Sequence, residues 1–381
     1  MSPPESTSEA AVEPRASADG DRPYGVLICL AAAKISEPRL ACYLQMPDAR
    51  MVIVGHESRP PADNLVRFPA WRVPYFGAPE RWTAALGWFR GLNELDPGPI
   101  DCVLSLELLN PTSGQASRLA KRFDVPHVVT IAEILPDNPV YRFPPWAQIS
   151  RLVSRSADAF VCSVELARQF AIGKGCPPDR CVVINPGIDL QRFTPRLGGR
   201  TNEPVVLFVG ELRPDKGIRY VINAVKSARR RIPELRLIIA GDGPLRGEVE
   251  EQAREGSFID YRGKIAHSEL PALYREARCF ILAPYSRRSW AEQFGFASIE
   301  AMASGLPVVI TDCGAVREVV PAWNPICGEH DVVALAAGIV AAVGDAGEEW
   351  GLRNREYAEE RFEIGKQAAK LRTWLHEEVI R

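Results

Sequence analysis

The sequence lacks any run of about 18 consecutive apolar residues, the length that a membrane-spanning helix requires. Its first 22 residues have neither the basic start nor the apolar centre of a secretory signal. Their Ser, Pro, Ala, Glu and Asp content predicts a disordered tail instead. The net charge of −2 is too small to indicate a nucleic-acid-binding protein.

Paired cysteines and clustered histidines are also missing. The nine cysteines stand singly, without a CxxC pair, and several fall inside apolar runs where a thiol packs like a small hydrophobe. The five histidines do not gather in sequence, and His127 and His267 are expected to be structural. This pattern argues against a zinc site or a disulfide framework, so no metal is expected and a cytoplasmic location is favoured.

Short β-rich runs alternate with helix-length stretches along the whole chain, and 381 residues are enough for two domains. Alternation of this kind predicts βαβ units and parallel sheets, so the fold class is α/β with two doubly wound domains. The expected strands lie at 24–32, 51–55, 100–106, 127–133, 159–163, 181–185, 204–210, 235–243, 258–263, 279–285 and 306–312.

The stretch 185–204 breaks the alternation, because it is rich in Pro and Gly turn signals and has no periodicity. We therefore expect a tail at 1–22, a first domain at 23–190, a linker at 191–203 and a second domain at 204–355. Apolar residues then recur in a charged helical pattern, which predicts a terminal helix over 356–381. Ligands of such sheets bind beyond the carboxyl ends of the strands, here in a cleft between the domains.

The segment EQFGFASIE places two carboxylates, Glu292 and Glu300, around an apolar stretch. The spacing predicts a loop at Glu292 and a helix that ends at Gly305, with Glu300 about one turn inside it. The amides of Phe294, Gly295, Phe296 and Ala297 would then form an anion site between the two carboxylates. A solvated loop charge and an exposed helix charge explain the spacing about as well.

Two further turns follow predicted strands. In VGELRPDKG, Lys216 falls where a strand meets a helix, a good position for a cation that faces a diphosphate. Taken alone, a turn with a solvated lysine is the more economical interpretation. The single G-x-G of AGDGP, residues 240–244, is a weak signal, since the full dinucleotide fingerprint is absent.

In combination these motifs resemble the retaining glycosyltransferases of family 4, which have the GT-B fold. The resemblance rests on NPGIDLQRF, VGELRPDKG, IIAGDGP, RGKIAHSELPALYREARCFILAPY and EQFGFASIEAMASGLPVVITDCGAVRE, in family order from about residue 155 to 320. It implies two Rossmann-like domains that face a central cleft, a first domain that binds the acceptor, and a terminal helix that crosses back onto that domain.

The resemblance also assigns roles. The second domain would hold a nucleotide sugar, UDP- or GDP-linked, with Glu300 on the ribose hydroxyls and Lys216 beside the leaving diphosphate. Glu292 and the amides of Phe294, Gly295, Phe296 and Ala297 would hold the transferred sugar and its diphosphate. Backbone at Gly263, Lys264 and Ile265 would frame the base, and Gly210 belongs to the same site. No cofactor or metal is expected, and the implied activity is that of a retaining hexosyltransferase.

Two departures from the family pattern affect the expected site. Glu211 stands where members often have Arg, so Arg213 is a candidate replacement for that charge. The first domain reads VVTIAE where the family commonly has a His-Asp pair, so Ala132 and Glu133 occupy those places. Glu133 is therefore a candidate site residue.

The acceptor stays open between a small metabolite, a polysaccharide and a lipid. Residues 68–92 mix aromatic side chains with arginines, a composition that suits a core helix, a sugar-binding platform or a peripheral contact with the inner face of a membrane. Two rival functions also stay open: a sugar-nucleotide epimerase or hydrolase on the same fold, and a non-catalytic nucleotide-sugar-binding partner subunit.

Overall fold

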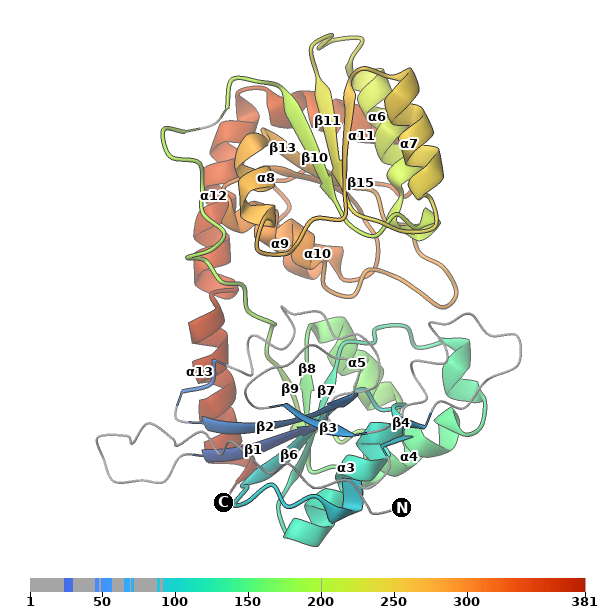
Figure 1. Cartoon of the computed structure of the whole chain (residues 1–381), viewed down its shortest axis with the longest axis vertical. Coiled ribbons are helices and arrows are strands. Elements are labelled where there is room, and N and C mark those ends of the chain that lie inside the picture. Colours follow the sequence, from blue (N-terminus) through green and yellow to red (C-terminus); the bar gives the residue numbers. More distant parts are fainter. Residues whose placement is uncertain are drawn as a thin grey trace, which may run out of the picture.

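The computed structural model describes residues 24–29, 45–47, 49–56, 65–68, 70–71, 88–89, 92–199 and 201–380. Two parallel sheets, each flanked by helices, form two halves that are joined by the segment after residue 183 and by the C-terminal helices (Figure 1). The expected tail at 1–22 and most of the aromatic segment 68–92 lie outside the described residues. No helix in the described ranges is both long and apolar enough to span a membrane.

The first sheet contains seven parallel strands in the order β3-β2-β1-β6-β7-β8-β9. Its central strands are runs of Val, Ile and Leu buried on both faces, as parallel strands between helical layers require. The strands are Tyr24–Cys29, Ala49–His56, Leu65–Phe68, Cys102–Leu106, His127–Ile131, Ala159–Cys162 and Cys181–Val183, for β1 to β3 and β6 to β9. The helices are α3 (Pro111–Phe123), α4 (Trp146–Ser156) and α5 (Glu165–Gly173), and the short β4 (Ala70–Trp71) and β5 (Trp88–Phe89) pair beside the sheet.

The second sheet contains six parallel strands in the order β12-β11-β10-β13-β14-β15. The direction of strand succession reverses between β10 and β13, and ligands of doubly wound sheets bind at such a switch point. The strands are Val205–Val209, Arg236–Ala240, Ile259–Gly263, Cys279–Leu282, Val308–Thr311 and Ile326–Cys327, for β10 to β15. The helices are α6 (Ile218–Ala228), α7 (Arg246–Glu255), α8 (Leu270–Glu276), α9 (Phe296–Ala303), α10 (Val316–Val319) and α11 (Val332–Val343).

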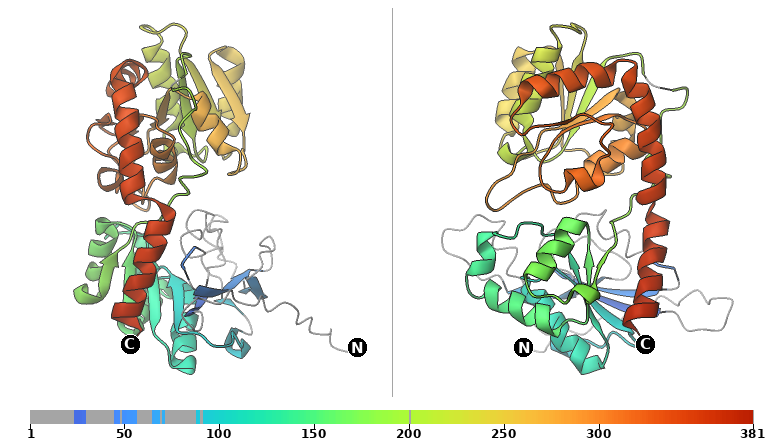
Figure 2. Two further views of the ribbon diagram at one scale, coloured as in Figure 1. Left: turned by 90° about the vertical axis from the view of Figure 1, so that its left-hand side faces the viewer. Right: turned by 180° about the vertical axis from the view of Figure 1, so that it is seen from behind.

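The C-terminal segment forms two helices, so the prediction of one continuous helix was wrong. Helix α12 (Ala346–Arg361) ends at Phe362, and α13 (Ile364–Trp374) begins under a new cap, because the Glu363 carboxylate accepts from the amides of Gly365 and Lys366. A π-helical turn, Leu375–Val379, follows. Figure 2 shows α12 beside the second half and α13 beside the first.

Helix α13 packs on the first sheet. Ile364, Ala368 and Leu371 are buried in one cluster with residues of β1, β6, β7 and β8. At the helix break the backbone of Ile188 exchanges hydrogen bonds with Phe362 and Ile364, at 2.7 and 3.1 Å. The C-terminus is therefore tied both to the first sheet and to the segment that leaves it.

The two halves also meet through α10. The carboxylate of Glu318 accepts hydrogen bonds from the backbone amides of Glu165, at 2.6 Å, and Leu166, at 2.9 Å. These are the first two residues of α5, whose amides have no partner within their own helix. A negative charge at a helix N-terminus is favourable, so this contact stabilises the observed approach of the halves.

We expect Glu318→Ala to lower the free energy of unfolding by roughly 0.5–2 kcal/mol, the usual cost of losing a helix cap. Glu360→Ala, which removes an exposed glutamate from α12, is the matched control and should change it by less than about 0.5 kcal/mol. Urea denaturation of the three proteins measures the difference. Equal stabilities of Glu318→Ala and the parent would show that the contact contributes nothing.

Candidate functional site

Lys216 follows the carboxyl end of β10, in the segment that leads to α6, at the end of the short 3-10 turn Pro214–Lys216. The turn passes into α6 through Gly217, which has a φ of +74°. A Cβ at Gly217 would collide with the carbonyl of Ala283, just after β13, so only glycine allows this close approach. The lysine is thereby held at the switch point between β10 and β13.

Glu292 reaches the same point from the loop after β13. Its Oε2 lies 2.6 Å from Nζ of Lys216, and the carboxylate is buried. Gly314, with a φ of +61°, passes so close to the Glu292 carbonyl that a Cβ there would clash. The sequence predicted both residues as site residues but did not predict that they form an ion pair.

Helix α9 starts immediately beside this pair, as expected, with Gly295 as its N-cap at a φ of +74°. The amide of Ser298 bonds to the carbonyl of Gly295, at 2.9 Å, whereas Phe296 and Ala297 occupy the first two helical positions, whose amides have no intrahelical acceptor. Phe294 precedes the cap and its side chain is buried. The helix terminus, its dipole and Lys216 thus provide electrostatic attraction for an anion.

Glu300 is the fifth residue of α9 and is held by two donors. His267 Nε2 lies 2.8 Å from Oε1, and the hydroxyl of Tyr274 donates to Oε2 at 2.9 Å. Burial, and secondly the Glu300 charge, raise the pKa of Tyr274 well above its ordinary value, so its hydroxyl stays a donor. A carboxylate offers about four lone-pair sites, so further donors can still bind to Glu300.

His267, which was expected to be structural, therefore belongs to the candidate site, although no pattern in the sequence connects it to Glu300. The two residues are 33 positions apart: His267 lies in the turn between β12 and α8, and only the tertiary structure brings it to Glu300 on α9. No sequence pattern connects Tyr274 to Glu300 either, although its hydroxyl donates to the Glu300 carboxylate. The ring centroid of Tyr274 lies 5.7 Å from that of Phe193.

Arg213 does not point freely toward the helix terminus. Its guanidinium makes a two-pronged contact with Asp215, at 2.9 Å for each bond, and a third bond of 3.2 Å to Glu211. Glu211 thus neutralises the arginine that was expected to compensate for it. Arg213 also lies over the indole of Trp290, 5.3 Å from the ring centroid.

Trp290, in the loop between β13 and α9, is a further residue of the site. Its indole lies 4.9 Å from Nζ of Lys216, and its backbone pairs with Arg287 in a tight turn. The ring therefore contacts both cations near the helix terminus and limits where their side chains can move.

We expect Trp290→Leu to lower turnover by about 2- to 30-fold, because cation–π contacts contribute roughly 0.5–2 kcal/mol. Trp290→Phe retains a ring and should recover part of the loss. Steady-state kinetics with the nucleotide-sugar donor that the family resemblance implies measure both variants. Normal turnover in the leucine variant would show that the ring does not position Lys216.

A hollow of about 210 Å³ lies beside these groups, at the carboxyl ends of β10 and β11. Lys264 and Ile265, both predicted for the base, and Gly210, predicted for the same site, line it together with Asp242 and Leu270. Gly263, at a φ of +66°, accepts from the amide of Gly241 and turns the chain out of β12. The face of a planar base can pack against Ile265 and Leu270 in this hollow, while the polar atoms at the edge of the base face Asp242 and Lys264.

Glu133, in the first half, is not brought into contact with the groups around Lys216. Its carboxylate accepts from the amides of Ile134 and Leu135, and from the side chain of Asn138, at 2.8–2.9 Å. The next residue, Ile134, does reach the second half, since its Cδ1 lies near Gly314. Glu107, at a φ of +62°, accepts from the amide of Ala132 and adds a second carboxylate at this edge of the first sheet.

Two family models match the chain, one described as glycosyl transferase 4-like domain, over residues 38–187, and one as glycosyl transferases group 1, over 191–361. The chain belongs to the group 1 glycosyltransferases. At the switch point of the second sheet, Lys216, Glu292 and the N-terminus of α9 lie together.

Several group 1 glycosyltransferases are similar in sequence. The sulfoquinovosyl transferase of Arabidopsis thaliana is 27% identical over 223 residues, which cover 54% of this chain and 42% of that protein. A GDP-mannose-dependent phosphatidylinositol dimannoside mannosyltransferase of Mycobacterium tuberculosis is 25% identical over 299 residues, 72% of each chain. The chain spans about half the length of the first curated relatives that it matches.

The solved structures confirm the GT-B fold. The crystal structure of Anabaena HepE, determined in complex with UDP, superposes with a TM-score of 0.71 at 17% identity and covers 93% of this chain and 99% of that one. The predicted fold class, two doubly wound domains, is therefore correct.

Proposed function

We propose that this group 1 glycosyltransferase moves a hexose, with retention, from a nucleotide sugar to a hydroxyl acceptor. The observation that carries the proposal is the convergence of Lys216 with the N-terminus of α9 at the switch point of the second sheet. When the bond between the sugar and the diphosphate breaks, negative charge grows on the departing phosphate oxygen. Lys216 and the amides of Phe296 and Ala297 are placed to stabilise that charge without a metal ion.

Glu292 has two roles in this proposal. Its ion pair keeps Nζ of Lys216 beside the helix terminus, and its second oxygen can accept from hydroxyls of the transferred sugar. Glu300 accepts from the ribose hydroxyls, while His267 and Tyr274 fix its orientation. The base occupies the hollow lined by Gly210, Lys264 and Ile265, next to Gly263.

We place the acceptor against the first domain, where Glu107 and Glu133 lie beyond β6 and β7. A metabolite, a polysaccharide and a lipid are all compatible with this edge. The M. tuberculosis relative acts on a phosphatidylinositol mannoside, which supports testing a lipid acceptor. A cytoplasmic protein with peripheral contact to the inner face of the membrane fits that case.

Product analysis tests the proposal. The protein is incubated with UDP-glucose or GDP-mannose, with and without acceptors of each class, and the products are followed by NMR. Acceptor-dependent transfer with an unchanged anomeric configuration supports it. Nucleotide release or a changed sugar without any acceptor would indicate a hydrolase or an epimerase.

A non-catalytic donor-binding subunit is the second candidate. It is favoured by one contact, the neutralisation of Arg213 by Asp215 and Glu211, which removes a cation from the diphosphate region. Such a protein would bind the donor and never consume it. The variant Glu211→Arg separates the two cases when turnover is measured. A rise in turnover would indicate a weakened enzyme, whereas no turnover in either protein would indicate a non-catalytic subunit.

A further inference from the structure

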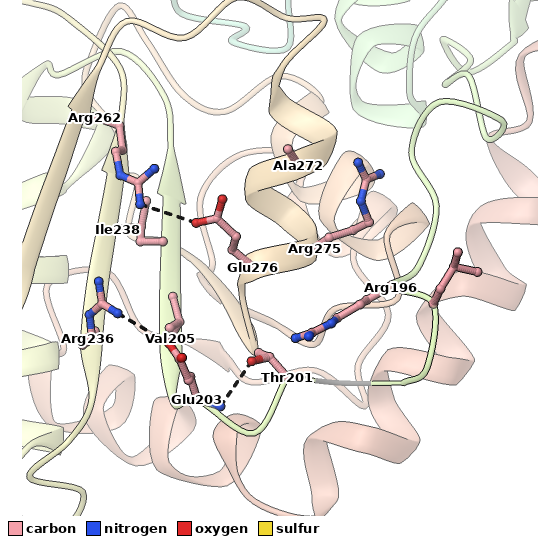
Figure 3. Close-up of a pocket in the computed structure, with 11 residues that line it drawn as sticks. Arg196, Thr201, Glu203, Val205, Arg236, Ile238, Arg262, Ala272, Arg275 and Glu276 are labelled. Carbon is pink, nitrogen blue, oxygen red and sulfur yellow. Dashed lines mark hydrogen bonds and ion pairs between the residues drawn. The ribbon is translucent and has the colours of Figure 1, made fainter.

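A second hollow, of about 520 Å³, lies in the second domain, and Figure 3 shows the residues that line it. Val205 and Arg236, the first residues of β10 and β11, line it, whereas Lys216 follows the carboxyl end of β10. The hollow therefore lies toward the opposite end of these strands from the candidate donor site. Binding of a ligand to this hollow can therefore be tested independently of the proposed function.

Arginines dominate the charge of this hollow. Arg236 and Arg262 project from β11 and β12, and Arg196 and Arg275 lie on the opposite side, on the linker and on α8 (Figure 3). Only two carboxylates, of Glu203 and Glu276, line it as well, and both lie 3.5 Å from their arginines, at the outer limit of a hydrogen bond. The lining thus carries a net positive charge.

Two of the arginines form no ion pair with any carboxylate in the part of the chain that the structure describes. Arg262 is held by Asp260, at 2.8 Å, but within residues 92–199 and 201–380 no ion pair forms at Arg196 or Arg275. A guanidinium offers five donors in a planar fork that matches phosphate oxygens. These two side chains are therefore available to a phosphate group.

An apolar hollow of about 250 Å³ adjoins the first one and shares Arg196, Thr201 and Arg275 with it. Its other walls include the apolar Pro195, Leu306 and Leu352, and the charged Glu348, Arg355 and Glu356. Leucines are also exposed at the rims of the two hollows, Leu197 to 95% and Leu352 to 66%. A polar anion alone would leave this apolar surface in water, whereas an amphipathic anion would cover it.

We propose that the two hollows bind an anionic phospholipid, with the phosphate between Arg196 and Arg275 and the first part of an acyl chain in the apolar hollow. Leu197 would enter the apolar layer of the bilayer beside it. Attraction of clustered arginines to an anionic leaflet and burial of apolar side chains act together in such contacts. The second domain would then face the membrane with the end opposite the donor site.

Co-sedimentation of the full chain with vesicles tests this proposal. We expect binding to phosphatidylglycerol vesicles to be at least about tenfold tighter than to phosphatidylcholine vesicles. The double variant Arg196→Glu, Arg275→Glu should lower it at least about tenfold, and Leu197→Asp should lower it as well. Thermal unfolding of each variant verifies that the fold is retained.

The matched control is the double variant Arg151→Glu, Arg155→Glu on α4, which lies away from both hollows. These two arginines are exposed and flank Leu152, whose exposed fraction is 49%. This variant should retain binding within about twofold. Loss of binding in the α4 variant, with retention in the Arg196 and Arg275 variant, would place the membrane contact on the first domain and overturn the proposal. Equal binding to both vesicle types, or to neither, would also overturn it.

A soluble phosphate is the other source of the same chemistry. Calorimetric titration with glycerol 3-phosphate separates it from a lipid. Affinity as high as that for the phosphatidylglycerol vesicles, and lost in the Arg196 and Arg275 variant, would identify the ligand as a free phosphate and would refute the lipid assignment. Weak or undetectable binding of the headgroup analogue supports the lipid.

Discussion

Replacing Glu300 with alanine is expected to lower the affinity for the nucleoside diphosphate by about 10- to 150-fold. A hydrogen bond to a charged group contributes roughly 1.5–3 kcal/mol, and the ribose hydroxyls would lose that acceptor. The loss should appear in the dissociation constant measured by calorimetry. Tyr274→Phe should raise the dissociation constant less than Glu300→Ala does, because it removes only one of the two groups that orient the Glu300 carboxylate.

Glu250→Gln is the control for this prediction, because Glu250 is partly exposed on α7, pairs with Arg246 and has no contact with the candidate donor site. That variant should bind nucleotide like the parent. Because Glu300 is buried, thermal unfolding is used to verify that the alanine variant is folded. A second variant, Glu300→Gln, keeps the shape of the side chain and the hydrogen bond from Tyr274. An unchanged dissociation constant in the folded alanine variant would remove Glu300 from the site.

Lys216→Ala is expected to lower turnover by about 100- to 1,000-fold while donor affinity falls by no more than about tenfold. Removing one group that stabilises charge in a transition state typically costs 10²–10³ in turnover, roughly 2.7–4 kcal/mol. The asymmetry arises because the charge on the departing phosphate grows as the bond breaks. Turnover from product formation and affinity from calorimetry are measured on the same preparation.

Lys226→Ala removes a lysine from the exposed side of α6, where it contacts Gln252, and should leave both constants unchanged. Lys216 neutralises the buried Glu292, so the loss of one residue also affects the other. The double variant Lys216→Ala, Glu292→Gln completes a double-mutant cycle, which gives the interaction energy between the two side chains. Equal losses of turnover and donor affinity in the single variant would show that Lys216 only binds the donor.

The positions of the main strands and of α9 were predictable, because they depend on local signals. Runs of Val, Ile and Leu mark buried strands, and Gly295 and Gly305 punctuate the helix that carries Glu300. The short β3 and β15 were missed, since a four-residue and a two-residue strand carry too little periodicity. The break at Phe362 was missed because the charged helical pattern continues through it, and only Glu363 acts as a cap.

The contacts within the site were less predictable than its members. Lys216 and Glu292 meet because β10 and β13 are neighbours at the switch point, which follows from strand order and not from either motif. His267 reaches Glu300 from the turn between β12 and α8, and Trp290 reaches Lys216 from the loop between β13 and α9. The role suggested for Arg213 depended on whether its charge is free, and only the structure shows Glu211 and Asp215 beside it.

The central claim is that the switch point of the second domain binds a nucleoside diphosphate through Lys216, α9 and Glu300. Calorimetric titration of the purified protein with UDP, GDP, ADP and TDP, each with magnesium and with a chelator, tests it most directly. We predict that one nucleotide binds clearly more tightly than the others and that its affinity does not depend on magnesium. Binding of none of the four, or binding that requires magnesium, would contradict the account.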